Sequence, residues 1–438
     1  MKRYLRSASA LVTSALLLSA GTVEARLGIF DLGYGTKSKG MGGTAVANPQ
    51  DSMVGATNPA GLVEVGSRLD GALQFLIPPR VYSHSNAIVG IQQQPAQQTL
   101  RGYPKLKVIP AFGWNKMVDG CRAVGFTVYS TGGQTYYKRG NPVTAGGNAA
   151  LLSEKAGVEL RTILTSFNFS QKLDPCHSIG ASLIIGLQHL RVRGFYAFDS
   201  ATSSLYPGSV TQSYDWAWGA GARVGYLGKI YDGLTIGASY TTQMAFQRMK
   251  QYKGLLPQAG RLDVPAVLSL GFAYELSPCS TFAFEYQRVF YRDLNTWHHS
   301  FNRYVNAGGA YLLGEKEGPG FGWNNHDIYK FGVDYDWDPC LKLRTGFTYS
   351  SRLYGDDQLD VNVLTQNMGR YHWSAGATWQ MSPCEELDFS YFYMFRVRRS
   401  GDSQLVGVGG TGGPPLSLGR LSQRMYQHSF ELNYGRRF

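Results

Sequence analysis

The sequence predicts an all-β protein: a 14-stranded antiparallel transmembrane β-barrel with an N-terminal hatch, or plug, inside its lumen. Three observations lead to this fold class. Apolar and polar residues alternate with a period of two over most of the chain, short turns alternate with long loops, and a compact segment without strand character precedes the first strand. Together these features are typical of transmembrane β-barrels.

The N-terminus has the form of a secretory signal peptide. A basic start at residues 2–6 precedes a short apolar run at 8–20 and a small-x-small cleavage site at 23–25. The apolar run is too short for a retained membrane helix, and no later stretch reaches the length of about 18 apolar residues that a helical span needs. We therefore expect three regions, namely a signal peptide (1–25), a hatch (26–67) and a barrel (68–438).

The hatch is expected around residues 40–63, GMGGTAVANPQDSMVGATNPAGLV, which are rich in small residues and nearly uncharged. Its two Asn-Pro pairs, Asn48-Pro49 and Asn58-Pro59, predict helix starts. Asn caps free N–H groups, and Pro is tolerated at the first helical position because that position needs no donor. The segment therefore predicts short helices packed tightly at its glycines.

The period-two alternation is clearest at the C-terminus. One face of the last strand is expected to meet lipid and consists of Tyr426, His428, Phe430, Leu432, Tyr434, Arg436 and Phe438. The same alternation recurs at residues 179–188, 216–226, 234–241, 329–337 and 373–379. A soluble β-sandwich also alternates, but export, 58 aromatic residues (28 Tyr, 22 Phe, 8 Trp) and strands of about 10 residues favour the membrane barrel.

The connections fall into two classes. Short turns are expected near 117–121, 173–177, 229–233, 276–280, 337–341 and 382–386. Long loops are expected near 78–104, 132–160, 191–214, 246–262, 291–326, 350–369 and 398–424. Six turns and seven loops connect 14 strands, with the long loops outside the cell. Pro110 and Pro265 fall within expected strands and each removes a ladder hydrogen bond, so they predict irregular places in the wall or positions near a rim.

The hatch pattern resembles a known family. GMGGTAVA, then Asp51, then NPAGL, placed just after a signal peptide, is similar to the N-terminal hatch of the long-chain fatty-acid transporter (FadL/TodX) family of the Gram-negative outer membrane. The resemblance covers nearly the whole mature chain and is weakest in the loops. It implies passive uptake of long-chain fatty acids or other hydrophobic compounds, captured at extracellular loops and released laterally through a kinked strand, without a cofactor or enzymatic activity.

A fatty-acid site needs apolar walls and a cation for the carboxylate. The candidate apolar residues in the third and fourth long loops are Phe195, Tyr196, Phe198, Phe246, Leu255 and Leu256. The candidate cations are Arg191 and Arg193, close to the place where the family has a basic residue after its fifth strand, and Lys316.

A gate is expected where the resemblance puts the kinked strand, at Ser130, Thr131, Gly132 and Gly133. Paired glycines weaken strand pairing, although they would equally suit a strand end. We expect the hatch residues Asn58, Pro59 and Ala60 to contact this stretch, because a kinked strand leaves backbone groups unpaired and the Asn58 amide can both donate and accept. The alternative is that Asn58 only caps a helix.

Five cysteines fall in expected periplasmic turns, within VDGC, LDPC, LSPC, WDPC and MSPC: Cys121, Cys176, Cys279, Cys340 and Cys384. Asp-Pro and Ser-Pro are turn chemistry, and no metal-binding Cys/His spacing occurs. Two interpretations stay open. The cysteines are turn residues, some of them disulfide-bonded in an oxidising compartment, or they form disulfides with partners in the envelope.

No catalytic motif is present, and no basic run with interleaved aromatics indicates nucleic acid. The formal net charge of +12 suits contact with anionic lipid headgroups or, equally, scattered solvated charges. The terminal Phe438 resembles the signal read by the barrel-assembly machinery. Besides transport, two functions are considered: a structural or adhesive envelope protein cross-linked through the turn cysteines, and a general porin. Porins lack an N-terminal hatch, so residues 40–63 count against the porin.

Overall fold

The computed structural model describes most of the chain after the expected signal peptide. The described residues are 27–85, 87–89, 92–94, 98–102, 106–137, 155–195, 198–199, 201, 204–210, 213–303, 311–363, 365–403, 406–407, 416–417 and 419–438. The predicted signal peptide (1–25) and the candidate Tyr196 lie outside them.

The predicted barrel is confirmed. Seventeen strand segments form one closed antiparallel sheet, and three pairs of segments (β1 with β2, β5 with β6, β11 with β12) each follow a single strand position, which gives 14 strands. The segments are β1 (Arg68–Ile77), β2 (Arg80–His84), β5 (Gln98–Arg101), β6 (Lys107–Met117), β7 (Arg122–Tyr137), β8 (Ala156–Lys172), β9 (His177–Arg193), β10 (Asp215–Tyr231), β11 (Leu234–Thr241), β12 (Ala245–Phe246), β13 (Val267–Ser277), β14 (Ser280–Val289), β15 (His326–Asp338), β16 (Leu341–Ser350), β17 (Tyr371–Ser382), β18 (Glu385–Asp402) and β21 (Arg420–Arg437). Pairing of β1 with β21 closes the barrel.

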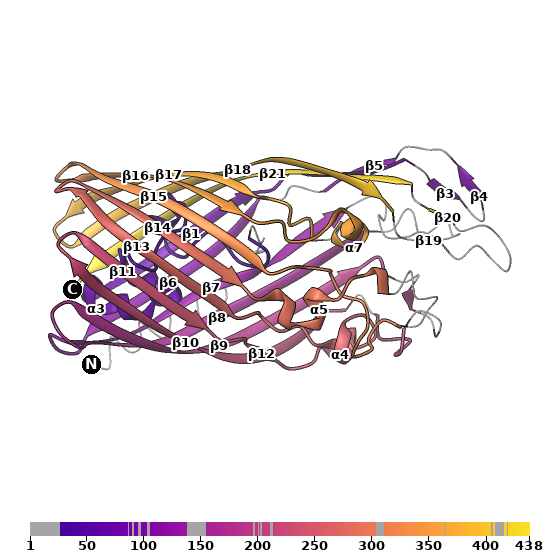
Figure 1. Cartoon of the computed structure of the whole chain (residues 1–438), viewed down its shortest axis with the longest axis horizontal. Helices are drawn as coiled ribbons and strands as arrows, with labels where there is room; N and C mark the ends of the chain where they lie inside the picture. The colour runs from indigo at the N-terminus through magenta and orange to yellow at the C-terminus, as the bar shows by residue number, and fades with distance from the viewer. Residues whose placement is uncertain are drawn as a thin grey trace.

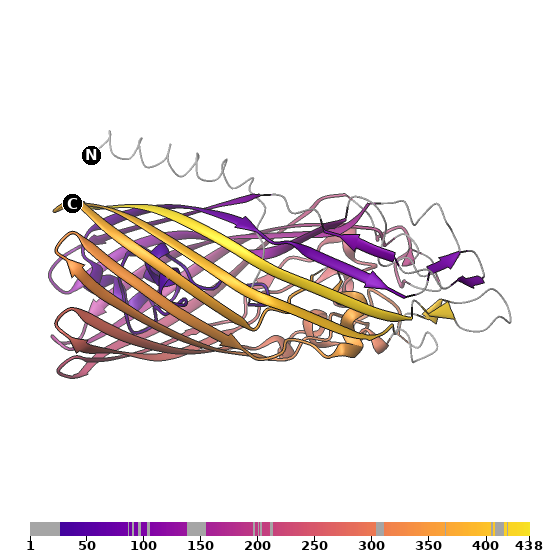
Figure 2. The same ribbon diagram turned by 90° about the horizontal axis from the view of Figure 1, so that it is seen from above.

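The two ends of the barrel differ as predicted. The six short turns lie together at the end that also holds the C-terminus, and the long loops lie at the opposite end (Figure 1). Seen from the second direction, β21 runs beside the first strands of the chain along the closure (Figure 2). In outer-membrane barrels the short turns face the periplasm, so the long loops are extracellular.

The extracellular end carries short helices and two small hairpins. The helices are η5 (Lys250–Tyr252), α4 (Pro257–Gly260), η6 (Tyr291–Asp293), α5 (Asn295–His298), η7 (Asp356–Gln358) and α7 (Leu359–Asn362). The hairpins are β3 (Ala87–Val89) with β4 (Gln92–Gln94), and β19 (Val406–Gly407) with β20 (Leu416–Ser417). No helix among the described residues is long and apolar enough to cross a membrane.

The predicted alternation sets the two faces of the wall. In β21 the side chains of Gln427, Ser429, Glu431 and Asn433 are buried toward the lumen, while Phe430, Leu432 and Tyr434 are exposed on the outside. The lumen is therefore polar where the hatch lies, and the outer face is apolar where lipid would surround it.

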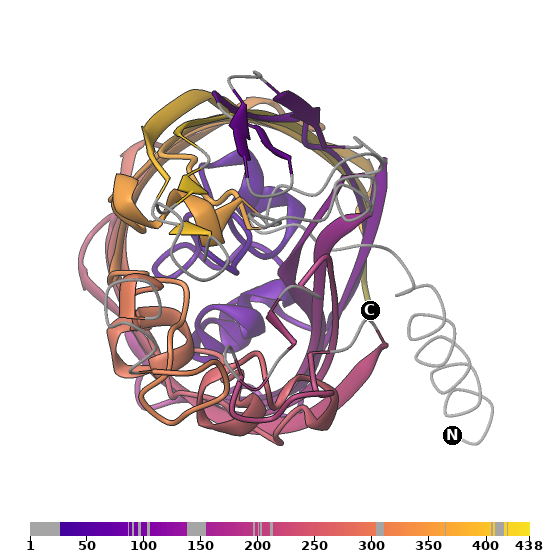
Figure 3. The same ribbon diagram turned by 90° about the vertical axis from the view of Figure 1, so that its right-hand side faces the viewer.

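The hatch occupies the lumen, where Figure 3 shows it down the barrel axis. It contains α2 (Thr36–Gly40), η1 (Ser52–Ala56), η2 (Pro59–Gly61) and α3 (Leu62–Val65). The helix start predicted at Asn58-Pro59 is confirmed, because the Asn58 side chain accepts a hydrogen bond from Ala60 N at 3.1 Å. The start predicted at Asn48-Pro49 is wrong: η1 begins later, where the Asp51 carboxylate accepts from Met53 N and so satisfies the free donor.

Glycines on the inner wall let the hatch lie directly against the strands. A side chain at Gly225 would overlap the Asn58 amide oxygen, and one at Gly180 would overlap the backbone of Pro59 and Ala60. Further wall glycines with hatch atoms in the space of a missing Cβ are Gly113, Gly237, Gly332 and Gly346. Close backbone approach is the physical reason for glycine at these strand positions.

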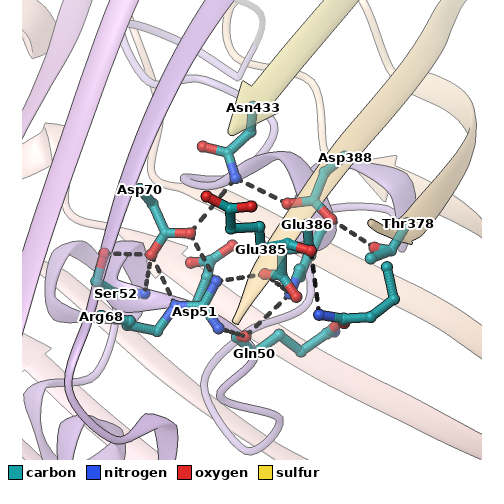
Figure 4. Close-up of polar contacts among 12 residues, drawn as sticks. Gln50, Asp51, Ser52, Arg68, Asp70, Thr378, Glu385, Glu386, Asp388 and Asn433 are labelled. Atoms are coloured by element: carbon teal, nitrogen blue, oxygen red, sulfur yellow. Dashed lines mark hydrogen bonds and ion pairs between the residues drawn. The ribbon is translucent and has the colours of Figure 1, made fainter. Parts of the chain in front are cut away.

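A buried network of charges joins the hatch to the barrel closure (Figure 4). Arg68 on β1 donates to both oxygens of Asp70, at 2.9 and 2.6 Å, and also pairs with Glu386 on β18. Hatch residues complete the network: Ser52 N donates to Asp70 at 2.9 Å, and Lys37 pairs with Glu386. A buried charge is costly unless it is paired and hydrogen-bonded, so these groups hold the hatch at one position.

A second anchor lies on the other side of the lumen. The Glu285 carboxylate of β14 accepts from the hatch backbone N–H groups of Ala45 and Val46, at 2.9 and 3.0 Å. Its other oxygen pairs with Lys330 of β15 at 2.8 Å. The hatch is therefore bound to strands around the barrel rather than to one side only.

The five cysteines occupy equivalent places on the periplasmic rim. All five are exposed and none is in a disulfide bond. Each cysteine carbonyl accepts a hydrogen bond of 2.8 Å from a backbone N–H of the next hairpin. Phe438 is exposed at the same rim, and its N–H donates to Ser67 O at 3.1 Å.

Candidate functional site

The barrel wall has a gap between β6 and β7. These strands pair over six positions, from Met117↔Ala123 to Phe112↔Val128. Beyond that point residues 107–111 of β6 and 129–136 of β7 form no strand pairing with each other in the described chain, and the strands meet again only at the bridge Gly102↔Tyr137. Pro110, which has no N–H to donate, lies in this unpaired stretch, as predicted for an irregular place in the wall.

The opposite edge of β7 is intact, since all 16 of its residues pair with β8 without a register shift. The glycines at the predicted gate therefore do not end the strand. Gly132 has φ of +135°, and a Cβ there would overlap the Leu160 carbonyl oxygen. Glycine is required at this position, and pairing is lost only toward β6.

Hydrogen bonds from the hatch and from two cationic side chains replace the missing backbone pairing between β6 and β7. Gly132 N donates to the carbonyl oxygen of Ile29 at 2.8 Å, and the Thr131 hydroxyl donates to the same oxygen. The Gln134 carbonyl accepts from Arg80 Nη1 at 2.9 Å and from Lys107 Nζ at 3.4 Å. The gap is thus closed by the start of the hatch on the inside and by two cationic side chains.

The segment that closes the gap is held from the loops as well. Ile29 N donates to the hydroxyl of Tyr291 in η6 at 2.9 Å. Complete burial raises the pKa of Tyr291 well above its usual range, so this hydroxyl is neutral at any physiological pH. Ile29 therefore connects an extracellular loop to the unpaired edge of β7.

An apolar cavity opens above this contact. Its inner end is lined by Ile29, Gly132 and Gly133, and its walls come from β8, β9 and the extracellular loops. Aromatic rings form one side: Trp297 and Trp323 stack with centroids 4.7 Å apart, and Trp297 and Phe321 stack at 5.4 Å. No charged side chain lines the cavity among the residues that the structure describes.

A second, polar cavity borders the same gap. It is lined by residues of β2, β6, β7, β8 and β9, including Lys107, Gln134 and Tyr136. Val158 of β8 lines both cavities. The apolar cavity and the polar cavity therefore adjoin at the gap.

Three of the predicted apolar residues line the inner cavity: Phe195, Leu255 and Leu256. Phe198 and Phe246 belong to the same buried hydrophobic cluster without lining the cavity, and Phe198 packs on Phe195 with ring centroids 5.6 Å apart. Phe195, Leu255 and Leu256 thus share one cavity, whereas the Phe246 ring packs against Gly186 and Gly219 of the wall.

The predicted cations are not at that place, which corrects the sequence-based expectation. Arg191 and Arg193 were expected in a loop, but β9 continues to Arg193 and keeps its alternation. Leu190 and Val192 therefore face the lumen, while the two arginines face outward, over the rings of Tyr214 and Tyr136. Lys316 is exposed in its loop and does not line the cavity.

The predicted contact of Asn58, Pro59 and Ala60 with Ser130 to Gly133 is also wrong. The Asn58 amide donates to Val46 O at 2.7 Å and to Tyr226 O of β10 at 2.9 Å. Cross-strand register puts Gly225, Gly180, Ser170 and Ala123 in one row at this level. Ser130 lies seven residues further along β7, about 23 Å at roughly 3.3 Å per residue.

The residues that make the actual contact carry no motif. Ile29 lies before the conspicuous glycine-rich stretch, and Trp297, Phe321 and Trp323 are spread through a long loop. The aromatic clustering of 290–323 is the one signal that could have indicated this wall of the cavity. Among the described residues, no group of three or more His, Cys, Asp or Glu side chains could hold a metal ion.

A hatch-filled barrel with an apolar cavity between its outer loops defines a class: the transport barrels of the Gram-negative outer membrane. Residues 30–404 match the family model described as outer membrane protein transport protein (OMPP1/FadL/TodX). The chain therefore belongs to this family of outer-membrane transporters for hydrophobic compounds, and the expected family and localisation are confirmed.

Solved structures agree on the fold. The toluene transporter TodX of Pseudomonas putida aligns with a TM-score of 0.64 at 15% identity, over 93% of this chain and 99% of that one. A FadL homologue of Pseudomonas aeruginosa gives 0.65 at 15% identity over 93% and 99%, and the toluene transporter TbuX of Ralstonia pickettii gives 0.60 at 15% over 93% and 99%. No curated protein matches the sequence.

Proposed function

We propose that the protein takes up uncharged hydrophobic molecules by diffusion, binding them in the apolar cavity and releasing them sideways through the gap between β6 and β7. One observation carries this proposal. The inner end of the apolar cavity, at Gly132 and Gly133, is also the unpaired edge of the barrel wall. A ligand at that end could leave through the wall without breaking hydrogen bonds between strands.

The lining of the cavity supports a neutral ligand. A buried carboxylate would need a cation or several hydrogen-bond donors, because desolvation of an unpaired charge is costly. The described lining offers aromatic and aliphatic side chains with Thr296, Thr365 and Asn367 as its side-chain polar groups. A fatty acid would have to leave its carboxylate outside, whereas a hydrocarbon or a neutral ester would be accommodated entirely.

The hatch supports selective passage over a general pore. It is anchored on opposite sides of the lumen by the Arg68–Asp70–Glu386 network and by Glu285. Wall glycines bring the hatch backbone into direct contact with the strands. A sideways route avoids moving this anchored segment out of the barrel.

The test compares two ligands that differ only in charge. Uptake of a long-chain fatty acid and of its methyl ester is measured in cells that carry the protein and in cells from which it has been deleted. The protein should accelerate entry of the ester more than entry of the acid. Equal acceleration of both would refute the neutral-ligand proposal, and no acceleration of either would refute transport of this ligand class.

The exit is tested at Val158, which lines both cavities. Val158→Trp should block the passage and reduce ester uptake to near the level of the deletion. The matched control is Val128→Trp, on the outer face of β7 where the strand pairs normally with β6. If Val158→Trp transports normally while the control also does, release does not follow this route.

A further inference from the structure

The outer surface carries a row of arginines where β18, β21, β2 and β5 lie side by side. Arg398 of β18 is directly opposite Arg424 of β21, Arg424 is opposite Val81 of β2, and Val81 is opposite Arg101 of β5. Directly opposite residues in antiparallel strands have Cβ atoms about 5 Å apart. Three guanidinium groups thus share one line across four strands, with a small apolar residue between two of them.

The alternation of each strand shows that this arginine row (Arg398, Arg424, Arg101) faces away from the lumen. Arg424 is exposed between the buried Gln423 and Met425, and Arg101 is exposed next to the buried Leu100. Arg398 is exposed opposite Arg424. The row can therefore be reached only from the surrounding membrane or the medium.

No carboxylate neutralises the row within the described part of the chain. Arg398 Nε donates to the Ser422 hydroxyl at 3.1 Å, and no ion pair among the described residues involves Arg424 or Arg101. The next acidic residue along β18 is Asp402, four positions beyond Arg398 and about 13 Å away at roughly 3.3 Å per residue. Like charges directly opposite each other destabilise a sheet, so an anion bound between the arginines would stabilise this part of the wall.

A local irregularity adds a fourth cation. The β18–β21 register shifts between Met394 and Val397, and this bulge exposes Arg396 beside the row. The Arg396 guanidinium lies over the ring of Tyr426, 5.3 Å from its centroid. Bulges are a recognised way of redirecting one side chain, and this one directs a cation to the outer surface.

The height of the row on the barrel indicates what it meets. Tyr426 lies two residues after Arg424 along β21, toward the membrane centre, and Tyr393 of β18 lies further in the same direction, opposite His428. Aromatic side chains on the outside of a barrel mark the boundary between lipid chains and headgroups. The arginine row is therefore at the level of the headgroups of the extracellular leaflet.

We propose that the arginine row, with Arg396, is a binding site for the phosphate groups of the phosphorylated glycolipid that forms the outer leaflet. A guanidinium group binds phosphate through two parallel hydrogen bonds, which suits arginine better than lysine for this task. Val81, which lies between Arg424 and Arg101, has a short side chain and leaves space for a phosphate between the two guanidinium groups. This proposal depends on the outer-membrane location and is independent of the ligand that the barrel transports.

The test replaces the row and a matched set of cations. In the first variant Arg101, Arg398 and Arg424 are changed to Gln. In the control, three exposed cations of the extracellular loop after β12 are changed to Gln, which removes the same charge on the same side of the membrane: Arg248, Lys250 and Lys253. Heat-dependent gel mobility shows that each variant forms a closed barrel.

Binding is measured by native mass spectrometry in detergent with bisphosphorylated lipid A, with its dephosphorylated form, and with heparin. Wild type and the control should bind bisphosphorylated lipid A at least about tenfold more tightly than the row variant, since each lost contact is a charge-assisted hydrogen bond. Equal binding by the row variant, or equal binding of the dephosphorylated lipid, would overturn the proposal. Row-dependent binding of heparin alone would also overturn it, in favour of a soluble polyanion.

Discussion

Asp51 is a hatch residue whose protonation depends strongly on its surroundings. Burial raises the pKa of its carboxyl group to about 7, and the neighbouring Asp70 carboxylate acts in the same direction, while Arg68 and Lys37 oppose it. Asp388 also faces the group and raises the pKa. Asp51 nevertheless caps η1 through Met53 N, so the position needs an acceptor but not a charge.

This predicts that the docked hatch is more stable in mild acid. Asp51 binds its proton more tightly when the hatch is docked. Its contribution to the free energy of docking is therefore fully present below about pH 4 and declines as the pH rises through about 7. The decline is at most about 1.4 kcal/mol per pH unit. Hydrogen exchange of the η1 amides, corrected for intrinsic rates, should show faster opening at about pH 8 than at about pH 5.

Asp51→Asn is the control, because the amide keeps the acceptor for Met53 N and removes the titration. Its opening rate should vary less with pH than that of the wild type. An unchanged pH dependence in this variant would assign the effect to another group.

Single residues show where sequence-based prediction succeeds and fails. The Asn58 cap was predictable because Asn-Pro chemistry is local. The contact of Asn58 with β10 was not, because the depth of the hatch in the barrel depends on strands more than 100 residues away. Arg191 and Arg193 were misplaced because a strand that continues beyond the lipid loses its apolar outer face, and with it the signal that marks it as a strand.

Among the strands, β7 is distinctive because its two edges differ. One edge pairs along its full length with β8, and the other leaves β6 after six positions and is covered by Ile29. Only the second edge can open without loss of a strand ladder. The mobility relevant to transport is therefore expected in the hatch segment 27–30 rather than in the strand.

A cross-link between these two elements should stop transport. With cysteines at positions 29 and 131, oxidation should join the hatch to β7, because the Thr131 hydroxyl already contacts Ile29 O. Uptake of the methyl ester should fall to the level of the deletion and recover when the disulfide is reduced. A cysteine pair at positions 58 and 131 should not form, given the separation of their levels in the barrel.

Normal uptake by the oxidised 29–131 variant would show that the segment does not have to move. The native five cysteines are changed to serine in all of these variants, so that only the introduced pair can react. That background must itself transport as the wild type does before the comparison is made.

At this scale most of the fold could be predicted. Fourteen strands follow from alternation and from the turn chemistry of Asp-Gly, Asp-Pro and Ser-Pro, which is local information. A weak place in the wall was predicted at Gly132–Gly133 of β7, but the strand from which β7 separates was not. Glycine indicates weak strand pairing without indicating which edge of its strand is affected. Pro110 lies on that partner strand, β6, but nothing in the sequence connected it with the glycines of β7.

For the molecule as a whole, the cysteines form a ring of exposed thiols around the periplasmic mouth. Neighbouring turns lie two strands apart, about 9 to 10 Å, beyond the reach of a disulfide, which needs Cα atoms within about 7 Å. We therefore propose that any disulfide these cysteines form joins the protein to another molecule of the envelope, rather than to itself.

The prediction is that all five cysteines react with a maleimide reagent in the folded, detergent-solubilised protein. Mass spectrometry should find five modifications in protein that has not been reduced beforehand, or fewer with a covalently attached partner that is released on reduction. An internal disulfide between two of the five would contradict the spacing argument and the proposal with it.

The network of Figure 4 also bears on how the protein is made. Lys37 and Lys39 of the hatch are synthesised before any strand of the barrel, and their carboxylate partners Glu386 and Glu431 lie on the last two strands. Until those strands are made, Lys37 lacks Glu386, Lys39 has Asp31 of the hatch but lacks Glu431, and the closing pair β1–β21 does not exist. We therefore expect the hatch to dock and the barrel to close together. A chain truncated before the last strands would have neither a docked hatch nor a closed barrel. We therefore expect the wall to close around its plug only when the last two strands are present.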